Sequence, residues 1–278
     1  MNRKPVHIAM YSGGASSAFV AYHMVKQYGR ENCILLFTDT LWEDEDNYRF
    51  MEDTAEYIGV PLTYVVDGRT PEDIFFETKY LGNARLARCS VELKVRQTLM
   101  FLEKLRTEQN LEPILYFGIG PHETHRAYNL RDFYADMPLE PVECRFPLIE
   151  TFTEEPDVRR IITEEWGIRL PRMYDLGFTH ANCGGRCVRG GFAHYAQLYK
   201  TWPERYALQE EMEEKFRNQQ KKNVSILKRG SHPYTLKQLR EHFETDPDYL
   251  EKLLSMNINM DKEDLQGAPC FICDIEKD

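Results

Sequence analysis

Apolar residues in the first half of the chain gather in short continuous runs, and these runs alternate with stretches of helical spacing. The runs predict strands at 6–10, 34–37, 62–66 and 114–117. The intervening apolar positions recur every three or four residues and predict helices near 18–28, 46–58, 72–80 and 90–108. Because strands that alternate with helices form mostly parallel sheets covered on both faces, we expect a doubly wound α/β fold.

The second half shows helical spacing only. Helices are predicted at 158–166, 192–199, 203–216, 235–243 and 249–254. Thr235 followed by Gln238 matches a capping box, which indicates a helix start. The polar and basic residues at 218–222 and 228–230 predict a mobile linker. We therefore expect a nucleotide-binding α/β domain over 1–150 and a helical, cysteine-bearing region over 151–278.

The segment Tyr11–Ser17 links the first predicted strand to the first predicted helix. Gly13 and Gly14 permit a sharp turn and leave room for a ligand to reach backbone N–H groups. Hydroxyls at Ser12, Ser16 and Ser17 and the helix N-terminus suit a bound anion. The spacing matches neither a Walker loop nor a dinucleotide fingerprint, so a phosphate cradle and a plain turn both remain open.

Two further polar segments follow predicted strands. Thr38-Asp39-Thr40 follows the second strand, and Gly118 to Glu123 follows the fourth. Since ligands of such sheets bind at the carboxyl ends of the strands, we expect these segments and the glycine loop to form one site. Asp39 could hold Mg²⁺ or a ribose hydroxyl there, or act as a helix cap. The acidic run at 43–46 is interpreted as a solvated first helical turn.

Composition limits the setting of the chain. It has 278 residues, 42% of them hydrophobic, and its net charge of −10 gives no overall attraction to nucleic acid. No apolar run reaches the roughly eighteen residues of a membrane span, and no signal-peptide core follows the first residues. We expect a cytoplasmic protein without a membrane partner. Its seven cysteines are then thiols, metal ligands or reactive groups; they are Cys33, Cys89, Cys144, Cys183, Cys187, Cys270 and Cys273.

Several short motifs occur in an order that is typical of one family. They are Ser12-Gly13-Gly14 with Ser17, Phe37-Thr38-Asp39-Thr40, Arg88-Cys89-Ser90 with Lys94, Gly118 with Glu123 and Arg126, Phe146-Pro147-Leu148-Ile149-Glu150, and Pro171 to Phe178 before Cys183 and Cys187. Together they cover about residues 6–200. The chain resembles the PP-loop ATP pyrophosphatases of the adenine nucleotide alpha hydrolase superfamily, in the branch similar to phosphoadenosine-phosphosulfate (PAPS) reductases.

The resemblance implies a HUP-like sheet whose first loop binds the phosphates of ATP or of an adenylyl sulfate. The implied nucleotide-binding residues are Ser12, Gly13, Gly14, Ser16, Ser17, Thr38, Asp39 and Gly118, and the implied catalytic residues are Asp39, Lys94, Arg126 and Cys273. Arg126 would clamp a phosphate or form an ordinary surface ion pair. Many relatives have Asp where this chain has Ser16, which leaves ATP cleavage open.

The cysteines suggest a metal or redox site. Cys183 and Cys187 share a glycine-bearing loop, and Cys270 and Cys273 form a second pair. Cys89 lies where similar adenylyl-sulfate reductases have cluster cysteines. These five could supply a [4Fe-4S] cluster, a structural zinc site or a persulfide relay. Cys33 and Cys144 are interpreted as buried thiols. The aromatic residues Tyr195, Tyr199 and Trp202 are interpreted as core, while Arg189 and His194 could face an anionic substrate.

Three functions follow from these expectations. The first is an ATP- and Mg²⁺-dependent enzyme that adenylates a substrate, releases pyrophosphate and transfers sulfur from a donor through its cysteines. The second is a sulfonucleotide reductase in which Cys270 or Cys273 attacks the substrate sulfur and a thioredoxin-like reductant resolves the product. The third is a nucleotide-binding module with a structural metal. If the substrate is tRNA or DNA, phosphate contacts are expected at Lys221, Lys222, Lys228 and Arg229.

Overall fold

The apolar runs of the first half pair as strands of one parallel sheet. In the computed structural model, which describes residues 3–137 and 140–259, the strand order is β3-β2-β1-β4-β5 and all neighbours are parallel. The strands are β1 (Lys4–Met10), β2 (Cys33–Asp39), β3 (Leu62–Val66), β4 (Leu111–Tyr116) and β5 (Glu143–Arg145). The predicted doubly wound α/β fold is confirmed.

Strand β1 is the centre of this sheet. His7 is in register with Cys33 of β2 on one side and with Ile114 of β4 on the other. Strands β2 and β3 extend the sheet on one side of β1, and β4 and β5 extend it on the other, so the order of the strands reverses at β1. A ligand crevice is expected at such a switch point. Strand β5 was not predicted, because it has only three residues and its two outer side chains, Glu143 and Arg145, are charged and exposed.

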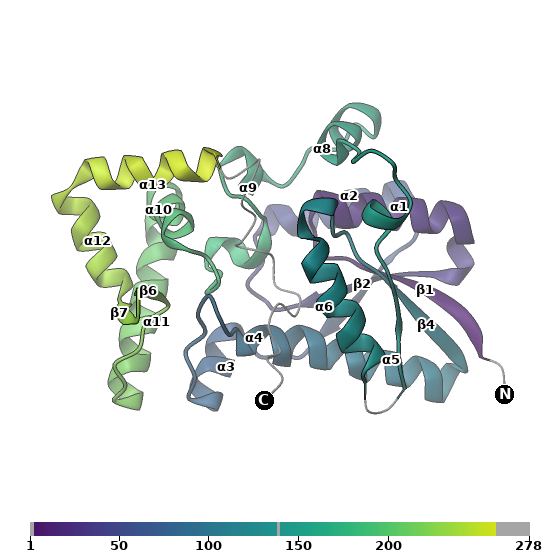
Figure 1. Cartoon of the computed structure of the whole chain (residues 1–278), viewed down its shortest axis with the longest axis horizontal. Helices are drawn as coiled ribbons and strands as arrows, with labels where there is room; N and C mark the ends of the chain where they lie inside the picture. Colours follow the sequence, from purple (N-terminus) through teal and green to yellow (C-terminus); the bar gives the residue numbers. More distant parts are fainter. Residues whose placement is uncertain (1–2, 138–139, 260–278) are drawn as a thin grey trace. The chain divides into compact units, whose positions relative to one another are not determined.

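Helices cover both faces of the sheet. Helices α1 (Ala15–Tyr28) and α2 (Glu45–Ile58) lie on one side, and α5 (Arg96–Gln109) lies on the other (Figure 1). Helix α6 (Thr124–Ala135) packs beside β5. The short helices α7 (Pro147–Glu150) and α8 (Val158–Arg160) follow, and α8 continues as one wider turn over Ile161–Glu165. The predicted helices of this half are present, although the one expected at 90–108 begins with an irregular turn at Val91–Val95.

Contacts between Cα atoms divide the chain into two compact units, each built from separate segments. The first unit contains the sheet and comprises the chain up to Asp39, Glu45–Asp67 and Lys94–Pro171. The second comprises Thr40–Asp44, Gly68–Leu93 and the chain from Arg172 onward. This division differs from a single boundary at residue 150, because residues 151–171 pack with the sheet and two earlier segments pack with the later helices.

The second unit is helical, as expected for the C-terminal region. Its helices are α3 (Pro71–Thr78), α4 (Arg88–Ser90), α9 (Arg172–Asp175), α10 (Phe192–Thr201), α11 (Pro203–Gln220), α12 (Leu236–Thr245) and α13 (Pro247–Asn259). An antiparallel ribbon of β6 (Leu227–Arg229) and β7 (His232–Tyr234) lies between α11 and α12 in the chain. The predicted linker was therefore wrong in part: residues 218–220 complete α11, and Lys228 and Arg229 belong to β6.

Side-chain hydrogen bonds fix two features of this unit. The capping box at the start of α12 is confirmed, because the Thr235 hydroxyl accepts from the Gln238 N–H while Gln238 Oε1 accepts from the Thr235 N–H. On α11, the buried Glu213 accepts hydrogen bonds from the backbone N–H groups of Ile226 (2.8 Å) and Leu236 (2.7 Å). Glu213 thus fixes both ends of the β6–β7 segment to α11.

Within the described ranges, none of the helices is both long enough and apolar enough to cross a bilayer.

The stability of the second unit should depend on pH through Glu213. Burial raises the pKa of its carboxyl to about 7, although the two backbone donors act in the opposite direction. At pH values between the ordinary pKa of a glutamate and about 7, the carboxyl of Glu213 has lost its proton in the unfolded chain but keeps it in the folded chain. The free energy of unfolding should therefore fall by up to about 3 kcal/mol as pH rises through this window. Below the window, the stabilisation that Glu213 contributes is present in full.

The measurement is urea unfolding of the whole chain at pH 5 and pH 8, comparing wild type with Glu213→Gln. The amide can accept only one of the two N–H bonds, so the variant should be less stable than wild type, and by a larger margin at pH 5. Glu211→Gln, on the exposed side of the same helix, is the matched control. An equal margin at both pH values would show that Glu213 does not titrate in this window.

Candidate functional site

The loop after β1 adopts a backbone conformation that suits glycine. Gly13 is buried and has φ +76°, and a Cβ there would lie 2.6 Å from Nδ2 of Asn47. Gly14 is the N-cap of α1 and has no side chain to accept from the first-turn N–H groups. A long helix therefore presents bare N–H donors at the carboxyl edge of the sheet, which is a favourable place for an anion.

Hydroxyl groups hold this loop in shape. Ser17 is almost fully buried, and its Oγ donates to the carbonyl oxygen of Gly14 at 2.8 Å. The same Oγ lies 3.4 Å from the N–H of Ser12, which donates to it. Ser12 and Ser16 remain partly exposed. Ser17 thus supports the loop, while the other two hydroxyls are accessible to a ligand.

Gly118, directly after β4 and Phe117, lies against the same loop. A Cβ at Gly118 would lie 2.6 Å from the carbonyl carbon of Ser16 and from the backbone nitrogen of Ser17. Neither backbone atom can move without displacing the start of α1. The structure therefore brings the first and fourth strand ends together, at a spacing that only glycine allows.

Asp39 ends β2 with its side chain almost fully buried. Its Oδ1 accepts a hydrogen bond from the hydroxyl of Tyr48 at 2.8 Å, and the preceding Thr38 is also buried. Sequence reasoning missed Tyr48 and Asn47. Both lie in the first turn of α2, and the available signal was the polar Asn47 on the same face as Phe50, Met51 and Thr54.

The two predicted cationic residues of this unit are buried. The Arg126 side chain is 4% exposed and forms an ion pair with Glu123, one helical turn away. This pair is buried, unlike the surface ion pair that the sequence left open as an alternative. Removal of either partner would leave the other charge buried without this ion pair, which is costly. Lys94 is 3% exposed and lies in the irregular turn that leads into α5.

The interpretation of residues 43–46 as a solvated acidic first turn was wrong in part: Glu45 and Asp46 form the first turn of α2 and Glu45 is exposed, but Glu43 and Asp44 precede the helix. In the second unit, Asp44 is 1% exposed and binds Arg172 through two hydrogen bonds of 2.8 Å and Arg205 through one of 2.9 Å. Glu43 accepts from the backbone N–H of Cys183 at 2.8 Å. In the first unit, Asp46 binds Arg49 and Arg169. These carboxylates carry tertiary contacts that local helix signals do not reveal.

Three of the five predicted soft ligands lie in one apolar cluster of the second unit. Cys89, Cys183 and Cys187 are buried and carry no disulfide. Cys183 has φ +57° and begins a left-handed turn continued by Gly184 and Gly185. Across residues 3–137 and 140–259, no three His, Cys, Asp or Glu side chains are arranged to hold a metal ion. Cys270 and Cys273 lie outside the described residues.

Other side chains have clear structural roles. Cys33 and Cys144 are buried in the first unit, and burial raises their pKa values to about 11 and about 12, as expected for structural thiols. The prediction that His194 could face an anion was wrong. Burial lowers its pKa to about 4, and its Nε2 lies 2.8 Å from the Gly185 carbonyl oxygen, so the ring is neutral at pH 7. Tyr195 is core, as predicted.

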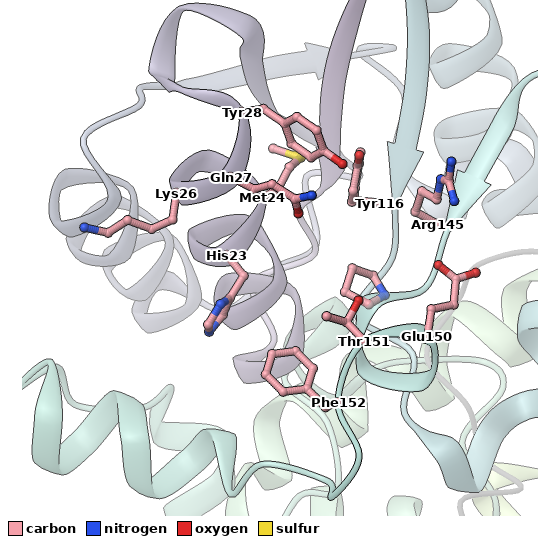
Figure 2. A pocket seen from close by; sticks show the side chains of 11 residues that line it. His23, Met24, Lys26, Gln27, Tyr28, Tyr116, Arg145, Glu150, Thr151 and Phe152 are labelled. Atoms are coloured by element: carbon pink, nitrogen blue, oxygen red, sulfur yellow. The ribbon is translucent and has the colours of Figure 1, made fainter.

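A hollow that the sequence did not predict lies beside α1 in the first unit (Figure 2). Its volume is about 520 Å³, and Tyr116, Arg145 and Glu150 line it. The Tyr116 hydroxyl lies 2.9 Å from Nδ1 of the buried His7, whose ring stacks on Tyr28. None of the residues predicted to bind nucleotide lines this hollow, so it is separate from the glycine loop.

Comparison with known proteins adds no assignment, since no family model and no curated protein matches the chain.

The contact between Gly13 and Asn47 can be tested through stability. Gly167 has φ +69° and open space around it, so Gly167→Ala should cost only the roughly 1–2 kcal/mol of a left-handed alanine. Gly13→Ala should cost about 1–3 kcal/mol more, because its Cβ displaces the buried Asn47 amide. Urea unfolding of both variants measures the difference. In a double-mutant cycle, Asn47→Ala should remove the excess; equal losses for the two alanine variants would contradict the contact.

Proposed function

We propose that this protein is a PP-loop ATP-dependent enzyme that adenylates its substrate, releases pyrophosphate and transfers sulfur. The observation that carries the proposal is the loop of bare N–H groups at Gly13 and Gly14, which is held against Gly118 at the switch point of the sheet. Such a loop suits the phosphates of ATP, and Asp39 ends the neighbouring strand.

The proposed roles follow from side-chain chemistry. The N–H groups of the loop and the hydroxyls of Ser12 and Ser16 would bind phosphate oxygens. Asp39, oriented by Tyr48, would hold Mg²⁺ or a ribose hydroxyl. Arg126 would stabilise charge on the phosphates after exchanging its bond to Glu123 for one to the ligand. Lys94 is assigned a catalytic role by the family resemblance alone.

The chemistry needs little more than positioning. AMP is a good leaving group once its phosphate is held, so the protein supplies orientation and electrostatic stabilisation. Sulfur transfer is assigned to the cysteines through the PAPS-reductase-like resemblance. The described cysteines do not by themselves complete a metal site. The [4Fe-4S] cluster therefore stays a prediction that depends on Cys270 and Cys273, and no step is derived through it.

One feature favours a second candidate. Ser16 stands where many relatives have Asp, and the loop then lacks one carboxylate for Mg²⁺. A nucleotide-binding module with a structural metal fits this change, and adenylyl-sulfate reduction by Cys273 remains the further alternative. The products separate the three: pyrophosphate for the first function, sulfite for reduction, and bound nucleotide without turnover for the module.

Substitution of Gly118 tests the nucleotide site. Gly118→Ala places a methyl group against the backbone of Ser16 and Ser17, so affinity for Mg²⁺–ATP should fall at least about tenfold, or 1.4 kcal/mol. Gly120→Ala is the matched control, because its Cβ meets only the flexible end of the Glu155 side chain. Calorimetric titration measures affinity, and a coupled assay follows pyrophosphate and sulfite. Wild-type protein that fails to bind ATP would contradict the proposal, as would sulfite without pyrophosphate.

Metal content tests the cysteine assignment. Anaerobically purified protein should contain about four iron atoms and matching acid-labile sulfide per chain. Cys183→Ala should lose most of this metal, because it removes a ligand. Cys144→Ala should keep it, since that thiol is buried beside the Val142 carbonyl in the other unit. Stoichiometric zinc would favour the structural-metal alternative, and full iron content in Cys183→Ala would exclude Cys183 as a ligand.

A further inference from the structure

One segment of the second unit reverses the charge of the rest of the chain. Residues 215–240 contain eight lysines and arginines and no aspartate or glutamate, in a protein whose net charge is −10. The segment runs from the last turns of α11 through the β6–β7 ribbon into the start of α12. Glu213 anchors it to α11 through the backbone of Ile226 and Leu236. The segment is therefore an ordered surface.

Three of its cations are neutralised by nearby carboxylates. Lys215 pairs with Glu72, Lys237 with Glu214, and Arg240 with Glu210 in a two-bond arrangement. The other five form no ion pair with any residue of the described ranges; they are Arg217, Lys221, Lys222, Lys228 and Arg229. We call these five the basic ribbon surface. Lys222 donates instead to the carbonyl oxygen of Lys79, at 2.6 Å.

The ribbon carries cations on both of its faces. Lys228 is in register with Pro233, and Arg229 is in register with His232. Because neighbouring residues of a strand point to opposite faces, Lys228 and Arg229 point in opposite directions. Residues 228–232 are all exposed, with Gly230 and Ser231 at the tip. The ribbon therefore ends in a narrow point with positive charge on either side.

Aromatic and polar contacts hold the surface in place. The Arg229 guanidinium lies 4.1 Å from the centre of the Tyr234 ring and donates to the Tyr249 hydroxyl at 3.0 Å. Arg217 and His232 line a hollow of about 580 Å³ that joins the end of α11 to the ribbon. Glu214 and Glu241 also line this hollow, and Glu214 is the partner of Lys237. Ordered cations lose less entropy on binding a charged partner than mobile ones.

We propose that the basic ribbon surface docks on duplex DNA, with the tip of the β6–β7 ribbon in the major groove. The major groove of B-DNA is about 12 Å wide and admits a two-stranded ribbon, whereas that of A-form RNA is too narrow. Lys228 and Arg229 at the exposed tip, with Arg217, Lys221 and Lys222 at the end of α11, are the cations that meet the phosphates bordering the groove. The acidic remainder of the chain repels DNA elsewhere, so this surface fixes where the duplex binds.

This docking does not depend on the nucleotide site. All five cations lie in the second unit, and the glycine loop lies in the first. Variants of the basic ribbon surface should therefore lose affinity for duplex DNA while they keep their affinity for Mg²⁺–ATP. Loss of both together would indicate misfolding, which circular dichroism of each variant checks.

The test is fluorescence anisotropy of the whole protein with a labelled duplex of roughly two helical turns. Salt is varied between about 50 and 200 mM KCl. Five phosphate contacts predict a slope of about −4.5 when the logarithm of affinity is plotted against the logarithm of salt concentration. Lys221→Gln with Lys228→Gln should reduce its magnitude by about 2. The control combines Lys104→Gln with Arg160→Gln, two exposed first-unit cations with partners Glu108 and Glu164. It removes equal charge and should keep the wild-type slope.

Several results would overturn the proposal. An equal loss of affinity for the duplex in both double variants would mean that binding depends on net charge alone. Tighter binding to single-stranded RNA of the same length would exclude docking in the major groove. Binding to phosphatidylserine vesicles without binding to the duplex would make the surface a membrane contact. Absence of duplex binding at the lowest salt concentration would also reject it.

Discussion

The close approach of two backbone segments at the centre of the sheet is the constraint on which the candidate site depends. β1 pairs with β4 in parallel from Lys4 to Ala9, so the loops that follow these strands emerge side by side. The loop after β1 must turn at once into α1, and the chain after β4 must pass against that turn. Gly118 makes this passage possible, because a methyl group would meet two backbone atoms of the turn. The exposed N–H groups of the loop are a consequence of this packing.

The sequence predicted the elements whose signals are local. Continuous apolar runs located β1, β2 and β4, because both faces of a central parallel strand are buried. The edge strand β3, with Tyr64 and Val66 exposed, was located by its β-branched and aromatic residues. The pair Thr235 and Gln238 located the start of α12, because a capping box needs only four residues. Gly13, Gly14 and Gly118 could be found because glycine marks special backbone geometry. Strand β5 could not, since three residues with exposed charged ends give no pattern.

The remaining features depend on partners far away in the chain. Asp44 resembles a surface acid in sequence, yet it is buried by Arg172 and Arg205, which lie 128 and 161 residues further on. Glu213 occupies a helical position that gives no hint of the two N–H groups it accepts from. Asn47 is similar, because its role follows from its fit beneath Gly13. Charge and polarity in a sequence do not say which side chain will find a complementary group.

The chain's path between the two units has a consequence for how the protein can be divided. It leaves the sheet unit after Asp39, returns at Glu45, leaves again after Asp67, and returns at Lys94 before its last departure at Arg172. Trp42 and Phe75, from the two excursions, complete the apolar cluster of the later helices. A fragment that begins at residue 151 would lack both aromatic side chains and expose the surface they cover. Genetic dissection of this protein therefore calls for substitution within the intact chain, since neither half carries a whole core.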